Sequence, residues 1–233
     1  MTAEFVPGTI VSSSPERARR QVGAWLMLCA ALVLSIAVVG GVTRLTHSGL
    51  SMVTWEPLTG ILPPMGAEAW EEEFSHYREF PEYQLLNRGM DLEGFKSIYW
   101  LEYSHRLLAR FIGVVYAVPF VVFLSLGWLE RQFAWRLFGL LILGAMQAVM
   151  GWMMVASGLV ERPDVSHYRL TAHLGLAALI WALLIWLALR VLLPQAVGGI
   201  GAPVPRGFRR MAITGTILVF VLILSGGLVA GLD

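Results

Sequence analysis

One short segment, Glu-Tyr-Ser-His-Arg at 102–106, could do chemistry at the start of a long apolar stretch. On a helix, residues three apart lie on one face, so the Glu102 carboxylate and the His105 imidazole would point the same way. Ionisable groups within a membrane span are costly to bury, and they therefore mark candidate functional sites. A second imidazole, His173, opens another apolar stretch. Two histidines on two helices can hold a haem iron between them.

The composition is that of a membrane protein. Of the 233 residues, 57% are hydrophobic and only 14% are charged, which is more apolar surface than a soluble domain of this size needs. The formal net charge is +1, and no basic arm suggests binding to nucleic acid. The single cysteine, Cys29, cannot form an intrachain disulfide and lacks the spacing of metal ligands.

Apolar runs of about 20 residues are long enough to cross the hydrocarbon of a bilayer. The sequence contains four clear runs of this kind and a fifth close to its last residue. We therefore expect an all-α, polytopic membrane protein. The expected spans are 22–42, 105–129, 134–157, 170–193 and 210–230.

Arginine placement predicts the orientation, because cytoplasmic loops carry an excess of basic residues. Arginines precede the first span, flank the turn between the second and third spans, and surround the connection from the fourth to the fifth. The N-terminus is therefore expected in the cytoplasm. The arginines concerned are Arg17, Arg19, Arg20, Arg131, Arg136, Arg190, Arg206, Arg209 and Arg210.

The loop at 43–98 is expected on the outer side and is too long for a simple connector. Its first part, 43–66, is rich in Gly, Pro and Trp and resembles a re-entrant or interfacial lid. Its second part, 67–94, is acidic and amphipathic, which predicts one or two short helices on the membrane surface.

A weak internal echo suggests a second repeat. The glycine pair at 40–41, near the end of the first span, overlays the pair at 226–227 with an offset of 186 residues. Repeated helix bundles are common in membrane proteins. The expected organisation is a tail at 1–21, a four-helix half at 22–193, a linker at 194–209 and the first span of a truncated second half at 210–233.

Each charged side chain near the two histidines has both a functional and a structural interpretation. His105 and His173 are expected near the outer ends of spans two and four, facing each other in the bundle. Glu102 could accept protons or position water there, or could simply pair with Arg106. Arg106, Arg110 and Arg169 could anchor haem propionates, since guanidinium pairs with carboxylate in a bidentate way. Snorkelling at the membrane interface is the alternative for these arginines.

Other polar residues give weaker signals. Glu73 and His76 repeat the Glu-x-x-His spacing, but a di-iron site needs a second such pair and further glutamates. His47 and His167 are expected in outer loops and exposed to solvent. A face of the third span that includes Gln147 could be the wall of a pocket or ordinary helix packing.

Together the motifs resemble the haem A synthase family, in the branch without a cysteine pair in the outer loop. The resemblance rests on the segment at 40–52 with Trp55 and Pro57, and on 102–106, 147–159 and 168–174. It extends from about residue 22 to the last residue.

The resemblance implies eight spans in two pseudo-symmetric halves and oxidation of the C8 methyl of haem O to the formyl of haem A. The half present here would bind haem O through His105 and His173, with Glu102 as the essential carboxylate. A b-type haem is implied for the missing C-terminal half, so the chain is expected to be a fragment. The implied partners are haem O and the bilayer, with haem O synthase as a candidate donor and a second copy of the chain as a candidate neighbour.

Two other function classes remain open. A non-enzymatic bis-histidine membrane cytochrome would pass electrons between haem and quinone. A haem transporter or chaperone would bind haem weakly and would not need Glu102. All three bind haem, but only the synthase converts haem O to haem A.

Overall fold

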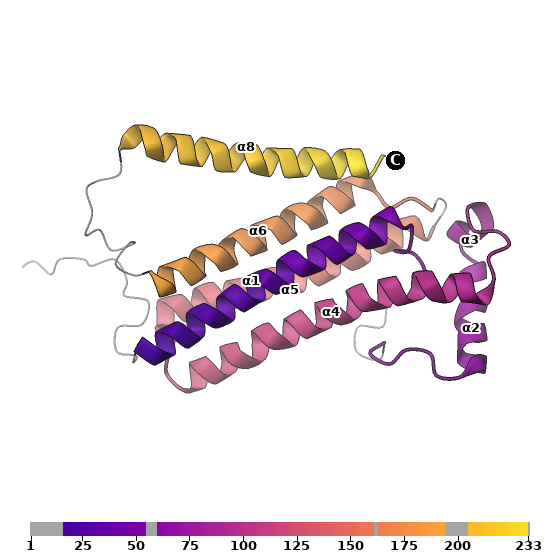
Figure 1. The fold of residues 1–233 in the computed structure, drawn as a ribbon, viewed down its shortest axis with the longest axis horizontal. Helices are drawn as coiled ribbons and strands as arrows, with labels where there is room; N and C mark the ends of the chain where they lie inside the picture. Colours follow the sequence, from indigo (N-terminus) through magenta and orange to yellow (C-terminus); the bar gives the residue numbers. More distant parts are fainter. Residues whose placement is uncertain (1–15, 55–59, 161–162, 194–204, 233) are drawn as a thin grey trace, which may run out of the picture. The chain divides into compact units, whose positions relative to one another are not determined.

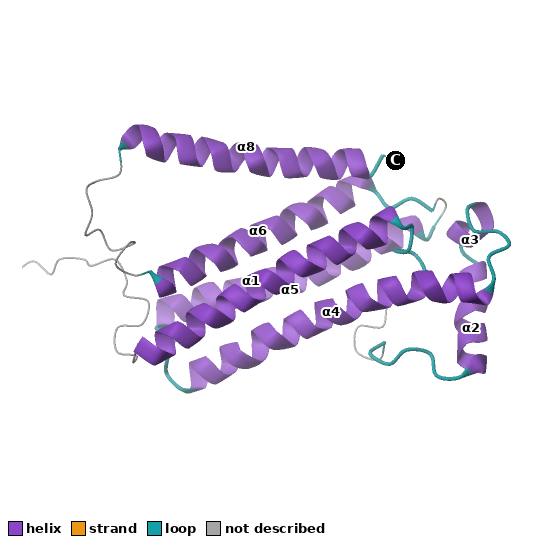
Figure 2. Cartoon of the chain, in the orientation of Figure 1, coloured by secondary structure: helices purple, strands orange, loops and turns teal. Residues whose placement is uncertain are grey.

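The computed structural model describes residues 16–54, 60–160, 163–193 and 205–232. Within these ranges the chain forms seven helices and no strand (Figures 1 and 2). The fold class expected from the sequence is therefore confirmed: the protein is all-α and polytopic.

Five of the helices are long and apolar enough to cross a membrane, which confirms the number of expected spans. Each long apolar run continues as helix into the polar residues that flank it. The five are α1 (Glu16–Leu45), α4 (Leu92–Ser125), α5 (Arg131–Gly158), α6 (His167–Leu192) and α8 (Arg206–Ala230).

The chain divides into two compact units, and most long helices contribute to both. Unit 1 comprises Met1–Leu34, Ile112–Ala145 and Ala177–Leu222. Unit 2 comprises Ser35–Phe111, Met146–Leu176 and Ile223–Asp233. Unit 2 thus takes the C-terminal ends of α1, α5 and α8 and the N-terminal ends of α4 and α6. Successive long helices therefore run through it in alternating directions.

The second span begins earlier than the sequence analysis placed it. The Asp91 side chain accepts a hydrogen bond from the backbone N–H of Gly94 at 2.8 Å, which caps the N-terminus of α4. Helix α4 starts at Leu92 for this reason, and His105 is its fourteenth residue rather than its first. The outer loop accordingly ends at Asp91 and not at residue 98.

Helix α1 ends in a Schellman motif whose left-handed residue is a histidine. His47 has φ 49°, its N–H bonds to the Arg44 carbonyl, and the Ser48 N–H bonds to the Thr43 carbonyl. These are the two hydrogen bonds that define the motif. The exposed His47 therefore turns the chain at the start of the outer loop.

In unit 1, a proline inside α4 explains one contact with α1. Pro119 has no N–H, so the carbonyl of Val115, four residues earlier, loses its helical partner. The indole N–H of Trp25 on α1 donates to this carbonyl at 2.8 Å. The Trp25 ring also packs on Tyr116, whose hydroxyl donates to the Leu137 carbonyl of α5 at 2.8 Å.

In unit 2, the outer loop folds onto the first part of α4 (Figure 1). It contains α2 (Ala67–Arg78) and α3 (Pro81–Leu85), which confirms the expectation of short helices. An aromatic core joins α2 to α4: Phe74 stacks on Phe95 with ring centroids 5.1 Å apart, and Trp70 meets Tyr99 edge-on at 5.0 Å.

The internal echo has a counterpart in unit 2. The offset of 186 residues that overlays the glycine pairs also overlays Arg44 on Ala230. The Arg44 guanidinium donates to the Ala230 carbonyl at 3.1 Å. The ends of α1 and α8 therefore meet at two positions that are 186 residues apart.

Candidate functional site

The two histidines expected to act together lie in the same unit. His105 is on α4 and His173 is the seventh residue of α6, and both side chains are half-buried in unit 2. The alternating direction of the helices brings them together, since α4 and α6 both contribute their N-terminal parts.

A glycine on a neighbouring helix faces each imidazole. A Cβ atom at Gly40 of α1 would lie 3.1 Å from Nε2 of His105. A Cβ atom at Gly151 of α5 would lie 2.9 Å from Cε1 of His173. Both distances are shorter than ordinary contacts, so a larger residue at either position would require the imidazole to shift.

Gln147 is the described residue that hydrogen-bonds with His173. Its amide nitrogen donates to the backbone carbonyl of His173 at 3.0 Å and lies 3.4 Å from the ring Nε2. Two buried polar atoms of this pair, Oε1 of Gln147 and Nδ1 of His173, have no hydrogen-bond partner within the described part of the chain. The sequence had left open whether this face of α5 was a pocket wall or plain packing.

Glu102 lies one turn before His105 and is 2% exposed. Its Oε2 accepts hydrogen bonds from the Ser51 hydroxyl and the Met52 backbone N–H, each at 2.8 Å. Its Oε1 accepts from Nε of Arg106 at 2.9 Å and from Nη2 at 2.5 Å. Both oxygens of this buried carboxylate are therefore fully paired, as a buried anion requires.

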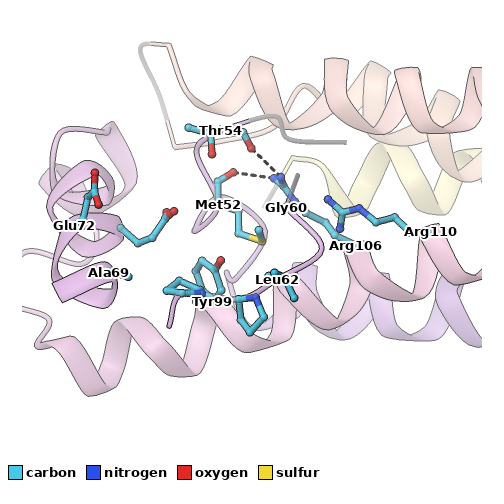
Figure 3. A pocket seen from close by; sticks show the side chains of 12 residues that line it. Met52, Thr54, Gly60, Leu62, Ala69, Glu72, Tyr99, Arg106 and Arg110 are labelled. Atoms are coloured by element: carbon cyan, nitrogen blue, oxygen red, sulfur yellow. Dashed lines mark hydrogen bonds between the residues drawn. The ribbon is translucent and has the colours of Figure 1, made fainter. Parts of the chain in front are cut away.

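Arg106 extends the same network to the outer loop. Its Nη2 donates to the Met52 carbonyl at 2.8 Å and its Nη1 to the Thr54 carbonyl at 3.0 Å (Figure 3). A guanidinium has five N–H groups, and these contacts together with those to Glu102 use four of them. Glu102 and Arg106 thus clamp the segment 51–54 onto α4.

A pocket of about 140 Å³ lies beside this clamp (Figure 3). Arg106 and Arg110 line it from α4, and Glu72 and Glu73 line it from α2. Neither histidine lines this pocket, so it is a feature separate from the imidazole pair.

The other candidate side chains differ in their exposure. Arg169 is exposed and donates to the Met153 carbonyl at 2.6 Å. His76 is exposed in the last turn of α2, while His167 begins α6 and is half-buried rather than solvent-exposed. Within the described ranges, no three His, Cys, Asp or Glu side chains gather as a metal site.

A buried carboxyl in the outer loop was missed by the sequence analysis. Glu82 of α3 is 3% exposed and accepts from the Tyr77 hydroxyl at 3.0 Å; Asn87 donates to that hydroxyl at 2.7 Å. Burial, and to a smaller degree the charge of Glu102, raises the pKa of Glu82 to about 7 against the lowering effect of the Tyr77 hydrogen bond. Only its flanking aromatic residues could have suggested this burial.

The comparisons with known proteins give one consistent result. Residues 23–233 match the model of the COX15-CtaA family, described as cytochrome oxidase assembly proteins. The chain is 48% identical over 217 residues to a protein of Nitrosospira multiformis named Heme A synthase, covering 92% of this chain and 60% of that protein. It is 50% identical to the Heme A synthase of Parvibaculum lavamentivorans, covering 89% of this chain and 59% of that protein.

A third relative, the Heme A synthase of Allorhizobium ampelinum, is 44% identical over all 233 residues, which cover 63% of that protein. The chain therefore spans about three fifths of the length of the curated relatives that it matches. No solved structure matches the chain. The match of the family model over nearly the whole sequence shows that the chain belongs to the COX15-CtaA family of cytochrome oxidase assembly proteins.

Proposed function

We propose that the chain takes part in haem A biosynthesis by binding haem O between His105 and His173 and oxidising its C8 methyl group to a formyl group. The observation that carries this proposal is the pair of imidazoles in unit 2, each seated against a glycine. The relatives are named Heme A synthase, which supports haem A as the product.

The residues around the imidazoles fit a haem. Imidazole nitrogens are common axial ligands of haem iron. Nδ1 of His173 is buried without a hydrogen-bond partner among the described residues, which is unusual unless a ligand changes its surroundings. The backbones at Gly40 and Gly151 pack closely against the two rings, where a Cβ atom would crowd them.

The reaction must remove four electrons from the substrate. Conversion of the methyl group to an aldehyde consumes one water and releases four protons and four electrons. Water supplies the oxygen in two successive hydroxylations, and the resulting gem-diol loses water to give the formyl group. A second haem, which the family resemblance implies for a C-terminal half, would supply the electron acceptor.

Glu102 is the proposed acceptor for the released protons. It lies one helical turn from His105 on the same face of α4. Its hydrogen bonds to Ser51 and Met52 also hold the outer loop against this face. The loop is thereby positioned to exclude bulk water from the substrate.

The propionates of haem O are proposed to bind to Arg169 and Arg106. Arg169 is exposed and has only one hydrogen bond within the described residues, so most of its donors remain for a carboxylate. Arg106 has one N–H left after its contacts with Glu102 and the loop. Arg169 is therefore the stronger anchor of the two.

The proposed setting is a bacterial inner membrane with the N-terminus in the cytoplasm, where haem O synthase would deliver the substrate. We also propose that the chain associates with a second copy of itself in this membrane. Unit 2 would then face the outer side, since it holds the acidic loop, while the arginine-rich ends of the helices belong to unit 1.

Extraction of the haems tests the proposal. The chain is produced in cells that make haem O but no haem A, and the membrane pigments are separated by chromatography. Haem A, or haem O with an oxidised C8 substituent, supports the synthase. Exclusive retention of unmodified haem b, with rapid electron exchange with quinone, would instead establish the membrane cytochrome.

A further inference from the structure

Two residues of α5 enclose the imidazole of His173 from one side. Gln147 and Gly151 are four residues apart and therefore lie on the same face of α5. The Gly151 backbone packs so closely against the ring that an added Cβ would lie 2.9 Å from Cε1. The Gln147 amide lies 3.4 Å from Nε2 of the same ring. The ring is held against α5 at two points.

The hydrogen bonds of Gln147 select one tautomer of the ring. Its amide nitrogen donates to the His173 carbonyl at 3.0 Å, which fixes the nitrogen end of the amide beside the ring. An amide nitrogen is only a donor, so a hydrogen bond at this 3.4 Å contact requires Nε2 of the ring as the acceptor. The ring proton then resides on Nδ1. A histidine that binds a metal through Nε2 uses this same tautomer.

The two unsatisfied atoms of this pair are complementary. In this tautomer Nδ1 of His173 is a buried donor, and Oε1 of Gln147 is a buried acceptor; neither has a partner within the described residues. Buried polar groups are rarely left unpaired. Metal-bound histidines nearly always donate their second N–H to an acceptor that orients the ring. Gln147 carries such an acceptor on the side chain that already contacts the ring.

We propose that Gln147 is the positioning residue for His173 in haem binding. Its amide nitrogen lies 3.4 Å from Nε2, and its Oε1 has no partner within the described residues. When Nε2 binds iron, the amide moves off Nε2 and its Oε1 accepts the hydrogen bond from Nδ1. The inference rests on the proposed function, since it takes His173 as a ligand of the haem iron.

The test uses the full 233-residue chain in detergent, with iron protoporphyrin IX as the probe. Three properties are measured: the affinity for the probe by optical titration, the low-spin electron paramagnetic resonance signal and the reduction potential. Gln147→Leu removes both the donor and the acceptor. Gln147→Glu keeps an acceptor and strengthens it. Gln84→Leu makes the same exchange at an exposed glutamine of the outer loop, and His173→Ala removes the ligand itself.

The proposal predicts that Gln147→Leu weakens binding by about 10- to 100-fold, the usual effect of losing such an outer partner, and alters the resonance signal. Gln147→Glu should keep the affinity and lower the reduction potential, because a carboxylate makes the imidazole a stronger donor. Gln84→Leu should match the parent chain.

Parent-like affinity and resonance in Gln147→Leu would overturn the inference while leaving the function intact, provided that His173→Ala abolishes the low-spin signal. An unchanged potential in Gln147→Glu would overturn it even if the Leu variant fails to fold. A low-spin signal that persists in His173→Ala would instead remove the haem assignment itself.

Discussion

The hydroxyl of Ser51 donates to the carboxylate of Glu102 at 2.8 Å, although 51 residues separate the two in the chain. Both side chains are almost fully buried. Because the neighbouring Met52 N–H donates to the same oxygen, the outer loop is tied to α4 at the turn that precedes His105. The position of the loop and the position of the carboxylate therefore depend on each other.

This relationship changes how Glu102 should be tested. All its described partners are donors, so the amide introduced by Glu102→Gln would place its NH₂ against the Met52 N–H or the Arg106 guanidinium. Glu102→Gln therefore disturbs the loop as well as removing the charge. Ser51→Ala is the matched variant, because it removes one loop contact and keeps the carboxylate.

We expect Glu102→Gln to lower haem A formation by about 10²-fold, the size expected for a lost acid–base group. Ser51→Ala should lower haem A formation too, but by a factor at least ten times smaller than the factor for Glu102→Gln. The comparison is made in membranes by chromatography of extracted haems, with hydrogen exchange of the 48–54 backbone as the measure of loop opening. Equal losses of activity in the two variants would show that Glu102 only positions the outer loop.

Adjacent glycines provide a test of the space at His105. Gly40→Ala should displace the imidazole, because its Cβ would lie 3.1 Å from Nε2, whereas Gly41 has no neighbouring atom within 4 Å of an added Cβ. Both exchanges raise helix propensity by a similar amount. Haem binding should weaken about tenfold or more in Gly40→Ala alone, by optical titration. Equal binding in the two variants would show that the glycine does not set the position of the ring.

The packing of α2 and α3 should depend on pH through Glu82. Because its pKa rises from the ordinary 4.5 to about 7 in the folded loop, the folded state binds the proton more tightly. Local stability is therefore highest below pH 4.5 and falls as the pH rises towards 7, by at most about 3 kcal/mol.

The measurement for Glu82 is hydrogen exchange at Leu86 and Asn87, whose N–H groups bond to its carbonyl. After correction for intrinsic rates, protection should decrease as the pH rises from about 5 to about 8. Glu82→Gln should remove this dependence, and Glu79→Gln, at an exposed position, should retain it. If protection in the parent chain did not change with pH, the raised pKa of Glu82 would be contradicted.

In unit 1, Trp25→Phe should destabilise the helices because the Val115 carbonyl, already freed by Pro119, would lose its donor. The expected cost is about 1–3 kcal/mol, typical of a buried unsatisfied group. Unfolding in mixed detergent micelles measures it. The control is Trp135→Phe on α5, where the side chain is largely exposed. A loss no larger than that of the control would contradict this explanation.

The sequence predicted the number of membrane spans because each needs an apolar run of sufficient length, but it placed the start of the second span 13 residues too late, at 105 instead of 92. It also allowed for pairing of Glu102 with Arg106, since these residues are four apart on one helix. The contact of Ser51 with Glu102 could not be predicted, because the path of a long loop depends on tertiary packing. The start of α4 was predictable from Asp91 as an N-cap. The contact of Trp25 was predictable in part, because Pro119 leaves a helix carbonyl without its usual donor.

The candidate site was only partly accessible from the sequence. Matched placement of His105 and His173 followed from the alternating direction of the spans. The glycines against their rings and the hydrogen bond from Gln147 depend on which faces of the helices meet, and no periodicity specified that. Whether these residues act on haem stays a prediction.

The central claim is that His105 and His173 together hold the haem substrate. The most direct measurement is the haem content and low-spin spectrum of the chain purified from cells that accumulate haem O. We predict bound haem O with a bis-imidazole signal, lost in His105→Ala and in His173→Ala but retained in His76→Ala, at an exposed histidine of α2. Bound haem with an unchanged signal in either of the first two variants would contradict the account.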